Sequence, residues 1–499
     1  MIIDVTRKML LFRRLRKGAR SLFSTPPRSQ ETDEVVVGYG SEGQSVFWPA
    51  PSAQAASHVV CLAASGAGKT VMVGNALLQE FLRGKQEQPP DKQASLLVCD
   101  PKGDLVEVIL QGLCAMAPDL LSRTWYLNPF SGGFPFNLNK LELGKTPVDI
   151  RAMQLASLVS QVSTATGAQR HLGVGARQLD VLQHVLLGAL DTDHPNANVL
   201  WAMDSLTLPK GMKKLAAITR SPRAKQFLQS ARLNDELLAS TSARLRSSFA
   251  ASANLERIVT TEKCIQFSRL LAPGRLTLID LGQPTGGLTS LQEFWANLLV
   301  RLAIEHLMER QSPWTGHHCR VAIDEAQVVA PVLADTAERI LTTGRSRGSS
   351  LVVLSQGTTL IHKASDTLLQ VLMTNAPAKL VGRLAAQDAE LLAKSQTPAL
   401  GVDVSISAIR QGFVAHVTNL PDRDFFRLVP GKRERFKSVE VDMEGWRQAT
   451  AQQVDKVAAL KKHLVIPESE KPRSTLADIR VKRKKPNPSA QPKLSSKWG

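Results

Sequence analysis

Short apolar runs recur along this chain, and most of them end in small or polar residues. The runs are Val59–Leu62, Leu96–Cys99, Thr124–Phe130, Leu276–Asp280, Cys319–Asp324, Leu351–Leu354 and Lys379–Gly382. Such continuous runs are typical of strands that are buried on both faces of a parallel sheet. Amphipathic patterns of helical period lie between them, as from Ser290 to about Met308. Strands that alternate with helices predict an α/β fold with a mostly parallel sheet, covered by helices on both faces.

Two weaker β patterns lie outside this series. Val35–Val37 and Val46–Trp48 flank the glycine-rich stretch Gly38–Gly43, which predicts a hairpin. Further along the chain, Phe413, Ala415 and Val417 occupy alternate positions, which predicts one more strand.

Between Pro147 and Leu271 the apolar residues follow a helical period instead. The helical patterns are Leu179, Leu182, Leu186 and Leu190, then Lys213–Ala217 and Asp235–Phe249. Because little in this stretch alternates as a strand would, we expect an all-α domain inserted into the α/β core.

The loop after the run Val59–Leu62 carries the first chemical signal. It reads Ala63-Ala64-Ser65-Gly66-Ala67-Gly68-Lys69-Thr70 and leads into a helical pattern. A strand, a small-residue loop ending in Lys-Thr and a helix together predict a phosphate-binding P-loop. Gly66 and Gly68 let the backbone curl so that several N–H groups face one anion.

This loop predicts ATP and Mg²⁺ as cofactors. The predicted nucleotide contacts are Ser65, Gly66, Ala67, Gly68, Lys69 and Thr70. Lys69 would reach the β- and γ-phosphates, and the Thr70 hydroxyl would be a Mg²⁺ ligand. One position departs from the full pattern, because Ala63 stands where glycine is expected. The alternative is a small-residue turn between strand and helix that binds nothing.

Adjacent carboxylates follow the strand pattern Val321–Ile323. Asp324 would hold Mg²⁺ through water opposite Thr70, and Glu325 would orient or deprotonate the attacking water. An Asp-Glu pair at a strand end is common by itself. Together with the P-loop it predicts an ATPase, because hydrolysis needs both a held phosphate and an activated water.

Three further segments offer site residues, each with an ordinary alternative. Asp100, together with Lys102, follows a buried strand where α/β proteins bind ligands, although Asp-Pro-x-Gly also forms a simple type I turn. Arg345 is the predicted arginine finger, acting across a subunit boundary, with Arg347 as the second choice; either could instead complement a helix dipole. Gln356 would sense the γ-phosphate, unless it is an ordinary strand-capping amide.

Composition narrows the class of protein further. The chain has 499 residues with 43% apolar content, enough for a large core and two or three structural units. Its net charge of +18 favours an anionic partner such as nucleic acid or a membrane surface. The five cysteines are scattered without any Cys-x-x-Cys pair, which suits a reducing cytoplasm and gives no sign of a structural metal. No stretch is typical of a transmembrane helix.

The chain divides into five predicted parts. They are a basic amphipathic segment and linker (1–34), the first part of the nucleotide-binding core (35–146), the all-α insertion (147–271), the second part of the core (272–440) and a C-terminal helix with a basic disordered tail (441–499). Met1–Arg20 would either lie on an anionic bilayer or be solvated. Lys471–Gly499 would either bind nucleic acid or a partner, or only add solubility.

These motifs together resemble the TraG/TraD-like coupling proteins of conjugative type IV secretion, within the FtsK–HerA group of P-loop ring ATPases. The resemblance runs from about Val35 to Phe436. It rests on His58 with Gly66–Thr70, Asp100–Asp104, Leu127–Phe130, Phe136-Asn137, Asp324-Glu325, Gly344–Ser346, Ser355-Gln356 and Asn375. Most family members begin with two transmembrane helices, which this sequence does not predict.

The resemblance implies a RecA-like core, a hexamer with the all-α domain at its cytoplasmic mouth, and an ATPase stimulated by DNA. Its implied work is DNA transfer in conjugation: it pumps single- or double-stranded DNA with an attached relaxase to the secretion channel. Two alternatives keep the same chemistry: an ATPase that couples protein substrates to secretion, or a soluble HerA/FtsK-type DNA translocase. We expect a cytoplasmic location, or peripheral contact with the cytoplasmic face of the inner membrane.

Overall fold

The computed structural model describes residues 35–48, 58–142, 146–161, 175–282, 289–396, 406–429, 432–467 and 475–479. The predictions for the N-terminal segment 1–34 and for residues 480–499 lie outside these ranges. Within them, no helix is long and apolar enough to cross a membrane.

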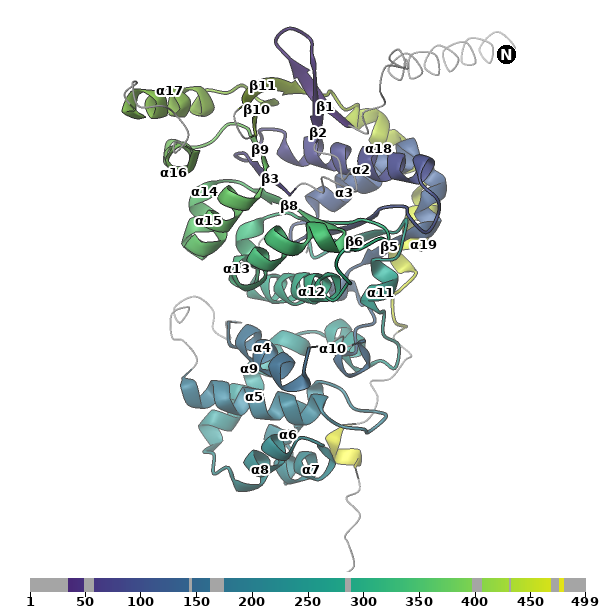
Figure 1. Cartoon of the computed structure of the whole chain (residues 1–499). Coiled ribbons are helices and arrows are strands. Elements are labelled where there is room, and N and C mark those ends of the chain that lie inside the picture. Colours follow the sequence, from purple (N-terminus) through teal and green to yellow (C-terminus); the bar gives the residue numbers. More distant parts are fainter. Residues whose placement is uncertain are drawn as a thin grey trace, which may run out of the picture. The chain divides into compact units, whose positions relative to one another are not determined.

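A single sheet forms the centre of the fold (Figure 1). Its parallel part has the order β9-β3-β8-β7-β4-β6-β5. The strands are β3 (Val59–Leu62), β4 (Ser95–Asp100), β5 (Thr124–Leu127), β6 (Leu276–Asp280), β7 (Cys319–Ile323), β8 (Ser349–Ser355) and β9 (Ala378–Val381). The prediction of an α/β fold with a mostly parallel sheet is therefore confirmed.

Both faces of this sheet are covered by helices, which explains the continuous apolar runs. Val59 and Cys61 face a core that contains α2 (Lys69–Glu87) and α3 (Asp104–Met116). Val60 and Leu62 face the opposite core, which contains α12 (Ser290–Met308), α13 (Ala326–Thr343) and α15 (Asp366–Asn375). Every residue of β3 is buried, so no polar position marks either face.

An antiparallel extension continues the sheet beyond β9, in the order β10-β11-β1-β2. Its strands are β1 (Val35–Gly40), β2 (Ser45–Trp48), β10 (Asp424–Val429) and β11 (Lys432–Ser438). The hairpin of β1 and β2 was predicted, but β10 and β11 were not. In β11 only Phe436 and Ser438 are buried, and the charged run 432–435 that precedes them hides the strand pattern.

The strand predicted at Phe413, Ala415 and Val417 is wrong. These residues lie in α17 (Ile406–Thr418), which packs against α16 (Ala386–Gln396). Phe413 and Val417 are buried and lie four positions apart, whereas Ala415 is exposed. The apolar residues therefore follow the helical spacing, and the alternation was incidental.

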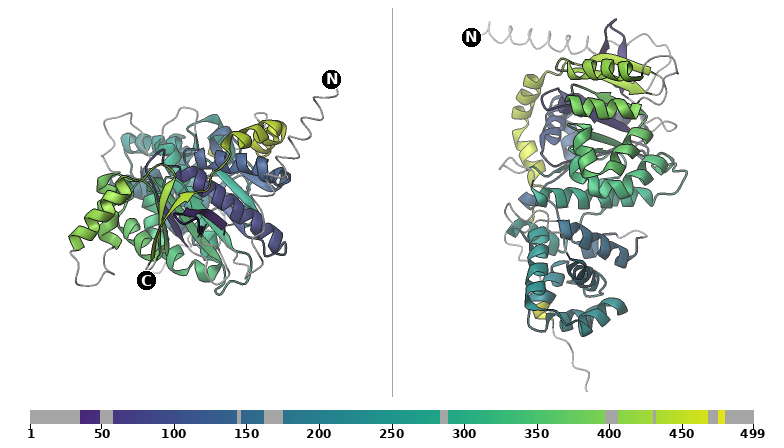
Figure 2. Two further views of the ribbon diagram at one scale, coloured as in Figure 1. Left: turned by 90° about the horizontal axis from the view of Figure 1, so that it is seen from above. Right: turned by 90° about the vertical axis from the view of Figure 1, so that its left-hand side faces the viewer.

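A purely helical stretch connects β5 to β6, and in its described residues no strand of the sheet occurs. Its helices are α4 (Val148–Gln161), α5 (Ala176–Leu190), α6 (Leu200–Thr207), α7 (Gly211–Ile218), α8 (Pro222–Ser230), α9 (Asp235–Phe249), α10 (Ala253–Thr260) and α11 (Phe267–Leu270). Side chains of Ser221, Asn234 and Ser252 cap three of them. Helix α4 packs against α12, so the apolar core continues from the sheet into this stretch (Figures 1 and 2).

The C-terminal segment contacts both the α/β core and the helical stretch. Helix α18 (Met443–Gln452) packs on α3, and α19 (Val454–Lys462) contacts β5. Further on, the short helix η6 (Leu476–Asp478) buries Leu476 completely between α6 and α7. The prediction of disorder from Lys471 onward is thus wrong for residues 475–479, because one apolar side chain docks within an otherwise charged segment.

A buried ion pair ties α2 to the sheet. Arg320 of β7 donates from Nε to Glu80 Oε1 at 2.7 Å, and Trp48 of β2 donates from its indole to Glu80 Oε2 at 2.8 Å. The Arg320 and Glu80 side chains are only 2% and 9% exposed. Burial raises the pKa of Glu80, so the carboxylate depends on the facing guanidinium to remain ionised.

Replacing Arg320 with alanine should therefore lower the free energy of unfolding by about 3 to 5 kcal/mol, because Glu80 is left buried without its counter-charge. Denaturant unfolding measures the change. The matched control is Arg435→Ala, which removes a pair with Asp424 whose arginine is 55% exposed and should cost less than about 1 kcal/mol. Equal losses in the two variants would contradict this account.

Candidate functional site

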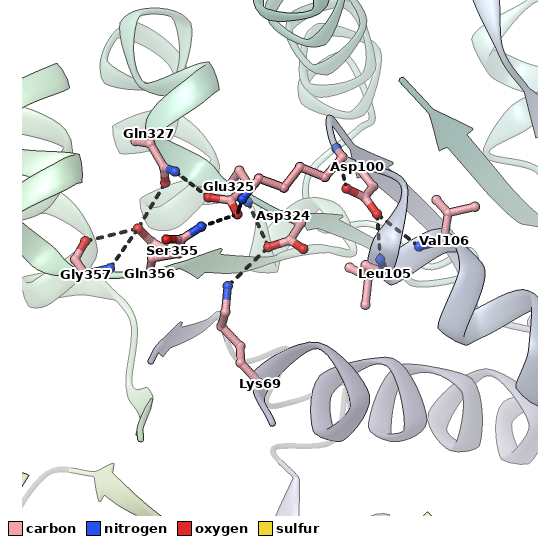
Figure 3. A network of polar contacts seen from close by, with 11 residues as sticks. Lys69, Asp100, Leu105, Val106, Asp324, Glu325, Gln327, Ser355, Gln356 and Gly357 are labelled. Atoms are coloured by element: carbon pink, nitrogen blue, oxygen red, sulfur yellow. Dashed lines mark hydrogen bonds and ion pairs between the residues drawn. The ribbon is translucent and has the colours of Figure 1, made fainter. Parts of the chain in front are cut away.

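The candidate site lies along the edge where the parallel strands end. Because these strands run in the same direction, the residues that follow β3, β4, β7 and β8 meet at one edge. Asp100 ends β4, Asp324 follows β7 and Ser355 ends β8. Figure 3 shows these residues close together with Lys69, which begins α2.

The P-loop between β3 and α2 has the curled backbone that the sequence predicted. Gly66 and Gly68 adopt φ angles of 81° and 88°, a left-handed conformation that favours glycine. In the part of the chain described, the backbone N–H groups of Gly68, Lys69 and Thr70 donate to no carbonyl. These donors at the N-terminus of α2 fit a chain of phosphates.

Three backbone hydrogen bonds hold this loop from segments that are distant in sequence. Ala63 N–H donates to Ser355 O at 3.2 Å, and Ala64 N–H donates to Arg383 O at 2.8 Å. Arg423, with a φ of 70°, donates its N–H to Ala67 O at 3.1 Å. Sequence analysis missed Arg383 and Arg423, because neither belongs to a recognisable motif.

The structure also accounts for Ala63. It is fully buried and does not have the positive φ that would demand glycine. The residue without a side chain is instead Gly382, directly after the neighbouring strand β9, where a Cβ would lie 2.8 Å from the Ala63 Cβ. The methyl group of Ala63 therefore occupies space that Gly382 leaves open.

Asp324 contacts both Lys69 of the P-loop and its neighbour Glu325. Its Oδ1 lies 3.4 Å from Lys69 Nζ and accepts the Glu325 N–H at 2.8 Å. Burial raises the pKa of Asp324 and the charge of Glu325 raises it further, whereas the Lys69 ammonium lowers it. The predicted Mg²⁺ ligand and the predicted phosphate-binding lysine thus meet directly.

Glu325 is held by several donors at once. Its Oε1 accepts from Gln356 Nε2 at 2.8 Å and from Lys102 Nζ, and its Oε2 accepts from Gln327 Nε2. Its backbone is left-handed, with a φ of 50°, which costs a non-glycine residue free energy. Burial raises the pKa of Glu325, but the hydrogen bonds from Lys102, Gln356 and Gln327 outweigh it, so the pKa lies below its usual value.

Asp100 organises the loop that carries Lys102. Its Oδ1 accepts the Lys102 N–H at 2.9 Å, and its Oδ2 accepts the N–H groups of Leu105 and Val106 at 2.6 and 3.1 Å. Burial, followed by the charge of Asp324, raises the pKa of Asp100 to about 7. Both carboxylate oxygens are engaged by backbone, so the contact predicted between Asp100 and a nucleotide stays a prediction.

Gln327 is a second residue that sequence analysis missed. It lies two positions after Glu325 and accepts from Ser355 Oγ at 3.1 Å through its own Oε1. Gln327 therefore links the end of β8 to the carboxylate of Glu325 (Figure 3). The spacing after the Asp-Glu pair was the signal that could have identified it.

Arg345 lies at the opposite edge of the sheet. It precedes β8, whereas Gln356 follows it, and a strand of this length separates them by about 20 Å. The exposed Arg345 guanidinium forms no ion pair with any described residue, whereas Arg347 donates to Arg310 O. A finger role for either arginine thus requires the nucleotide site of another copy, and the unpaired Arg345 suits it better.

His58 lies near this amino edge. Its Nδ1 accepts the Leu351 N–H at 3.1 Å. Burial, followed by the charges of Arg320 and Arg345, lowers its pKa to about 4, so the imidazole is neutral at pH 7. His58 joins the start of β3 to β8, and thereby links the strand that leads into the P-loop to the strand that follows Arg345.

The donor set fits a Mg²⁺ ion that is shared with phosphates. In the described residues, no group of three or more His, Cys, Asp or Glu side chains could hold a metal by itself. Mg²⁺ in nucleotide sites usually takes one or two protein oxygens, with phosphates and water completing the shell. Thr70, in the first turn of α2, and Asp324 are the residues that would supply them.

The chain was compared with known proteins. No family model and no curated protein matches it. Among solved structures, VirB4 of Thermoanaerobacter pseudethanolicus has a TM-score of 0.53 and 15% identity, over 84% of this chain and 99% of that one. The plasmid coupling protein TrwB with ADP and Mg²⁺ has a TM-score of 0.51 and 16% identity, over 83% and 90%. The bacterial conjugative coupling protein TrwBdeltaN70 in an unbound form gives 0.50 and 15%, over 83% and 89%.

At these identities the likeness shows the fold alone. It covers most of this chain and nearly all of the compared chains, so this protein has the P-loop NTPase fold of TrwB and VirB4. The prediction of a fold like that of the conjugative coupling ATPases is thereby confirmed.

The packing of Ala63 against Gly382 can be tested by a pair of substitutions. Gly382→Ala would place a methyl group 2.8 Å from the Ala63 Cβ and 2.9 Å from the Phe425 ring, which should cost about 1 to 3 kcal/mol of stability. Adding Ala63→Gly removes one of the two clashes and should recover part of the loss. Denaturant unfolding measures both variants, and a double variant no more stable than Gly382→Ala would refute the compensation.

Proposed function

We propose that this protein is an ATP-hydrolysing motor that delivers DNA, with an attached relaxase, to a type IV secretion channel. The observation that carries the proposal is the continuous network from Lys69 through Asp324 and Glu325 to Gln356 (Figure 3). On this proposal, a phosphate-binding cation, a Mg²⁺-binding carboxylate, a general base and a γ-phosphate sensor share one chain of contacts.

Each residue has a defined part in the proposed hydrolysis. Lys69 and the P-loop N–H groups hold the β- and γ-phosphates, while Thr70 and Asp324 hold Mg²⁺, which neutralises charge on the phosphates. Glu325 orients and deprotonates the attacking water. Gln356, which contacts Glu325 at 2.8 Å, reports the presence of the γ-phosphate to β8.

The place of Arg345 supports a ring of subunits, and we propose that the ring is a hexamer. Because Arg345 and Gln356 stand at opposite ends of β8, one chain cannot supply both to the same nucleotide. In a closed ring, each subunit would place its Arg345 at the γ-phosphate of its neighbour. Hydrolysis then depends on assembly, as expected of a ring motor.

DNA is the proposed cargo because two independent features favour a polyanion. The net charge is +18, and the compared structures that carry nucleotide are of a plasmid coupling protein. The alternatives are protein substrates of a secretion channel, which VirB4-like folds leave open, and a soluble DNA translocase of HerA/FtsK type. Co-purification distinguishes the three functions. A bound relaxase would support DNA delivery, bound effectors would support protein secretion, and a bound nuclease would support a soluble DNA translocase.

The proposed location is the cytoplasm, at the cytoplasmic face of the inner membrane when the protein is engaged with a channel. Met1–Arg20 with its seven Lys and Arg residues would provide peripheral contact with anionic lipid. Flotation with anionic and neutral vesicles separates this contact from attachment through a channel subunit.

The motor proposal predicts ATP hydrolysis that single-stranded DNA stimulates and that salt suppresses, since phosphate contacts weaken as salt rises. Lys69→Ala should abolish nucleotide binding, and Glu325→Gln should keep binding but lower kcat by about 100-fold or more. Steady-state ATPase rates with and without DNA, together with binding of a fluorescent ATP analogue, measure these effects. An ATPase rate that is the same with and without DNA would contradict DNA as the cargo, but it would leave the proposed ATPase activity standing.

The shared site predicts complementation between two inactive variants. Arg345→Ala should lower kcat by about 1000-fold or more, whereas Arg347→Ala should stay close to wild type. When Arg345→Ala and Glu325→Gln subunits are mixed equally, about a quarter of the interfaces regain Glu325 on one side and Arg345 on the other, so activity should reappear. ATPase assays of the mixtures test this, and mixtures as inactive as their components would exclude a finger that acts between subunits.

A further inference from the structure

Lys102 is a charged residue of the network around Glu325 that has no part in the hydrolysis proposed above. It follows β4 and its ammonium contacts Glu325 Oε1, yet its side chain is 37% exposed while that of Glu325 is 4% exposed. One end of this ion pair is therefore buried, and the other is partly exposed at the surface of the site. Such a pair can separate by movement of the lysine alone.

The backbone that carries Lys102 is held firmly, so only its side chain is free to move. Asp100 accepts the Lys102 N–H, and the Pro101 carbonyl accepts from Gln292 Nε2 at 3.0 Å. Gln292 is 2% exposed and belongs to the first turn of α12. The backbone of Lys102 is thus held in place beside Glu325.

The site contains two parallel lysine–carboxylate pairs. Lys69 is paired with Asp324, and Lys102 is paired with the next residue, Glu325. The two carboxylates are joined by the Glu325 N–H, which donates to Asp324 Oδ1 at 2.8 Å. A nucleoside triphosphate held by the P-loop brings its terminal phosphate beside these carboxylates and competes with them for lysine ammonium groups.

Glu325 has little capacity left to accept a water while all its present partners remain. Oε1 is occupied by Lys102 and Gln356, and Oε2 by Gln327, which leaves about one of the four lone-pair sites of a carboxylate. Loss of the Lys102 contact would open Oε1 on its exposed side.

We propose that Lys102 restrains Glu325, and that the Lys102 side chain moves its ammonium group from Glu325 to the γ-phosphate when a nucleoside triphosphate binds. The transfer frees Glu325 to engage water only when a γ-phosphate is present. Lys102 thereby favours triphosphate over diphosphate at this site. This inference rests on the proposed ATPase function and adds a residue to it.

A thermodynamic cycle tests the competition by binding, without reference to turnover. Full-length wild type, Lys102→Met, Glu325→Gln and the double variant are titrated with fluorescent ATPγS and ADP in the presence of Mg²⁺. Lys102→Met should weaken ATPγS on the order of tenfold and leave ADP nearly unchanged. Glu325→Gln releases Lys102 from its competitor, so it should tighten ATPγS several-fold, and this gain should vanish in the Lys102→Met background.

Three controls make the outcome decisive. Lys102→Arg keeps a cation and should restore part of the preference for ATPγS, which a merely structural lysine would not require. Lys213→Met removes an exposed lysine on α7 and should change neither affinity. Thermal melting confirms that each variant is folded.

The inference is overturned if Lys102→Met leaves the ratio of ATPγS to ADP affinity unchanged, or if Glu325→Gln tightens ATPγS equally with and without Lys102. Both results leave the ATPase proposal intact, provided wild type binds and hydrolyses ATP. A wild-type protein that binds neither nucleotide would overturn both proposals.

Discussion

The contact between the Lys69 ammonium and the Asp324 carboxylate joins two halves of the site that lie 255 positions apart in the chain. Both side chains are nearly buried, at 7% and 4% exposed, so neither charge is tolerable without the other. The contact therefore requires β3 and β7 to end at the same edge, with β8 between them. The P-loop, the Asp-Glu pair and the glutamine after β8 share one site because the sheet satisfies this requirement.

The same sheet separates two of the proposed site residues, Arg345 and Gln356. Strand β8 carries Arg345 before its first residue and Gln356 after its last. At the amino edge the Glu80 carboxylate compensates the buried Arg320 guanidinium, and His58 is neutral because burial and the nearby arginines lower its pKa. At the carboxyl edge the buried groups are acids, and lysines compensate them. A rigid strand between the edges keeps the two ends of β8 at a fixed separation, which suits a motor whose subunits read each other's nucleotide.

Much of the fold and the site was predictable, because the relevant signals are local. Continuous apolar runs identify buried parallel strands, and Lys69, Asp324, Glu325 and Gln356 were predicted in the segments that follow such runs. The structure brings these four residues into one chain of contacts. The missed features depend on long-range contacts. Arg423 has no motif, and its role arises because the loop before β10 crosses the P-loop. The strand β11 was hidden because its outward residues are charged, and the docking of Leu476 depends on a surface formed by α6 and α7.

The position of the helical stretch explains how so large an insertion leaves the candidate site undisturbed. It connects β5 to β6, the two strands at one end of the sheet, whereas the site residues follow the central strands β3, β8, β7 and β4. Long connections add little further entropic cost to closing a loop, so an edge crossover tolerates expansion. Yet the insertion is not isolated, because α4 packs on α12, and Gln292 in the first turn of α12 binds the carbonyl next to Lys102. Helix α12 therefore joins the helical stretch to the loop that carries Lys102.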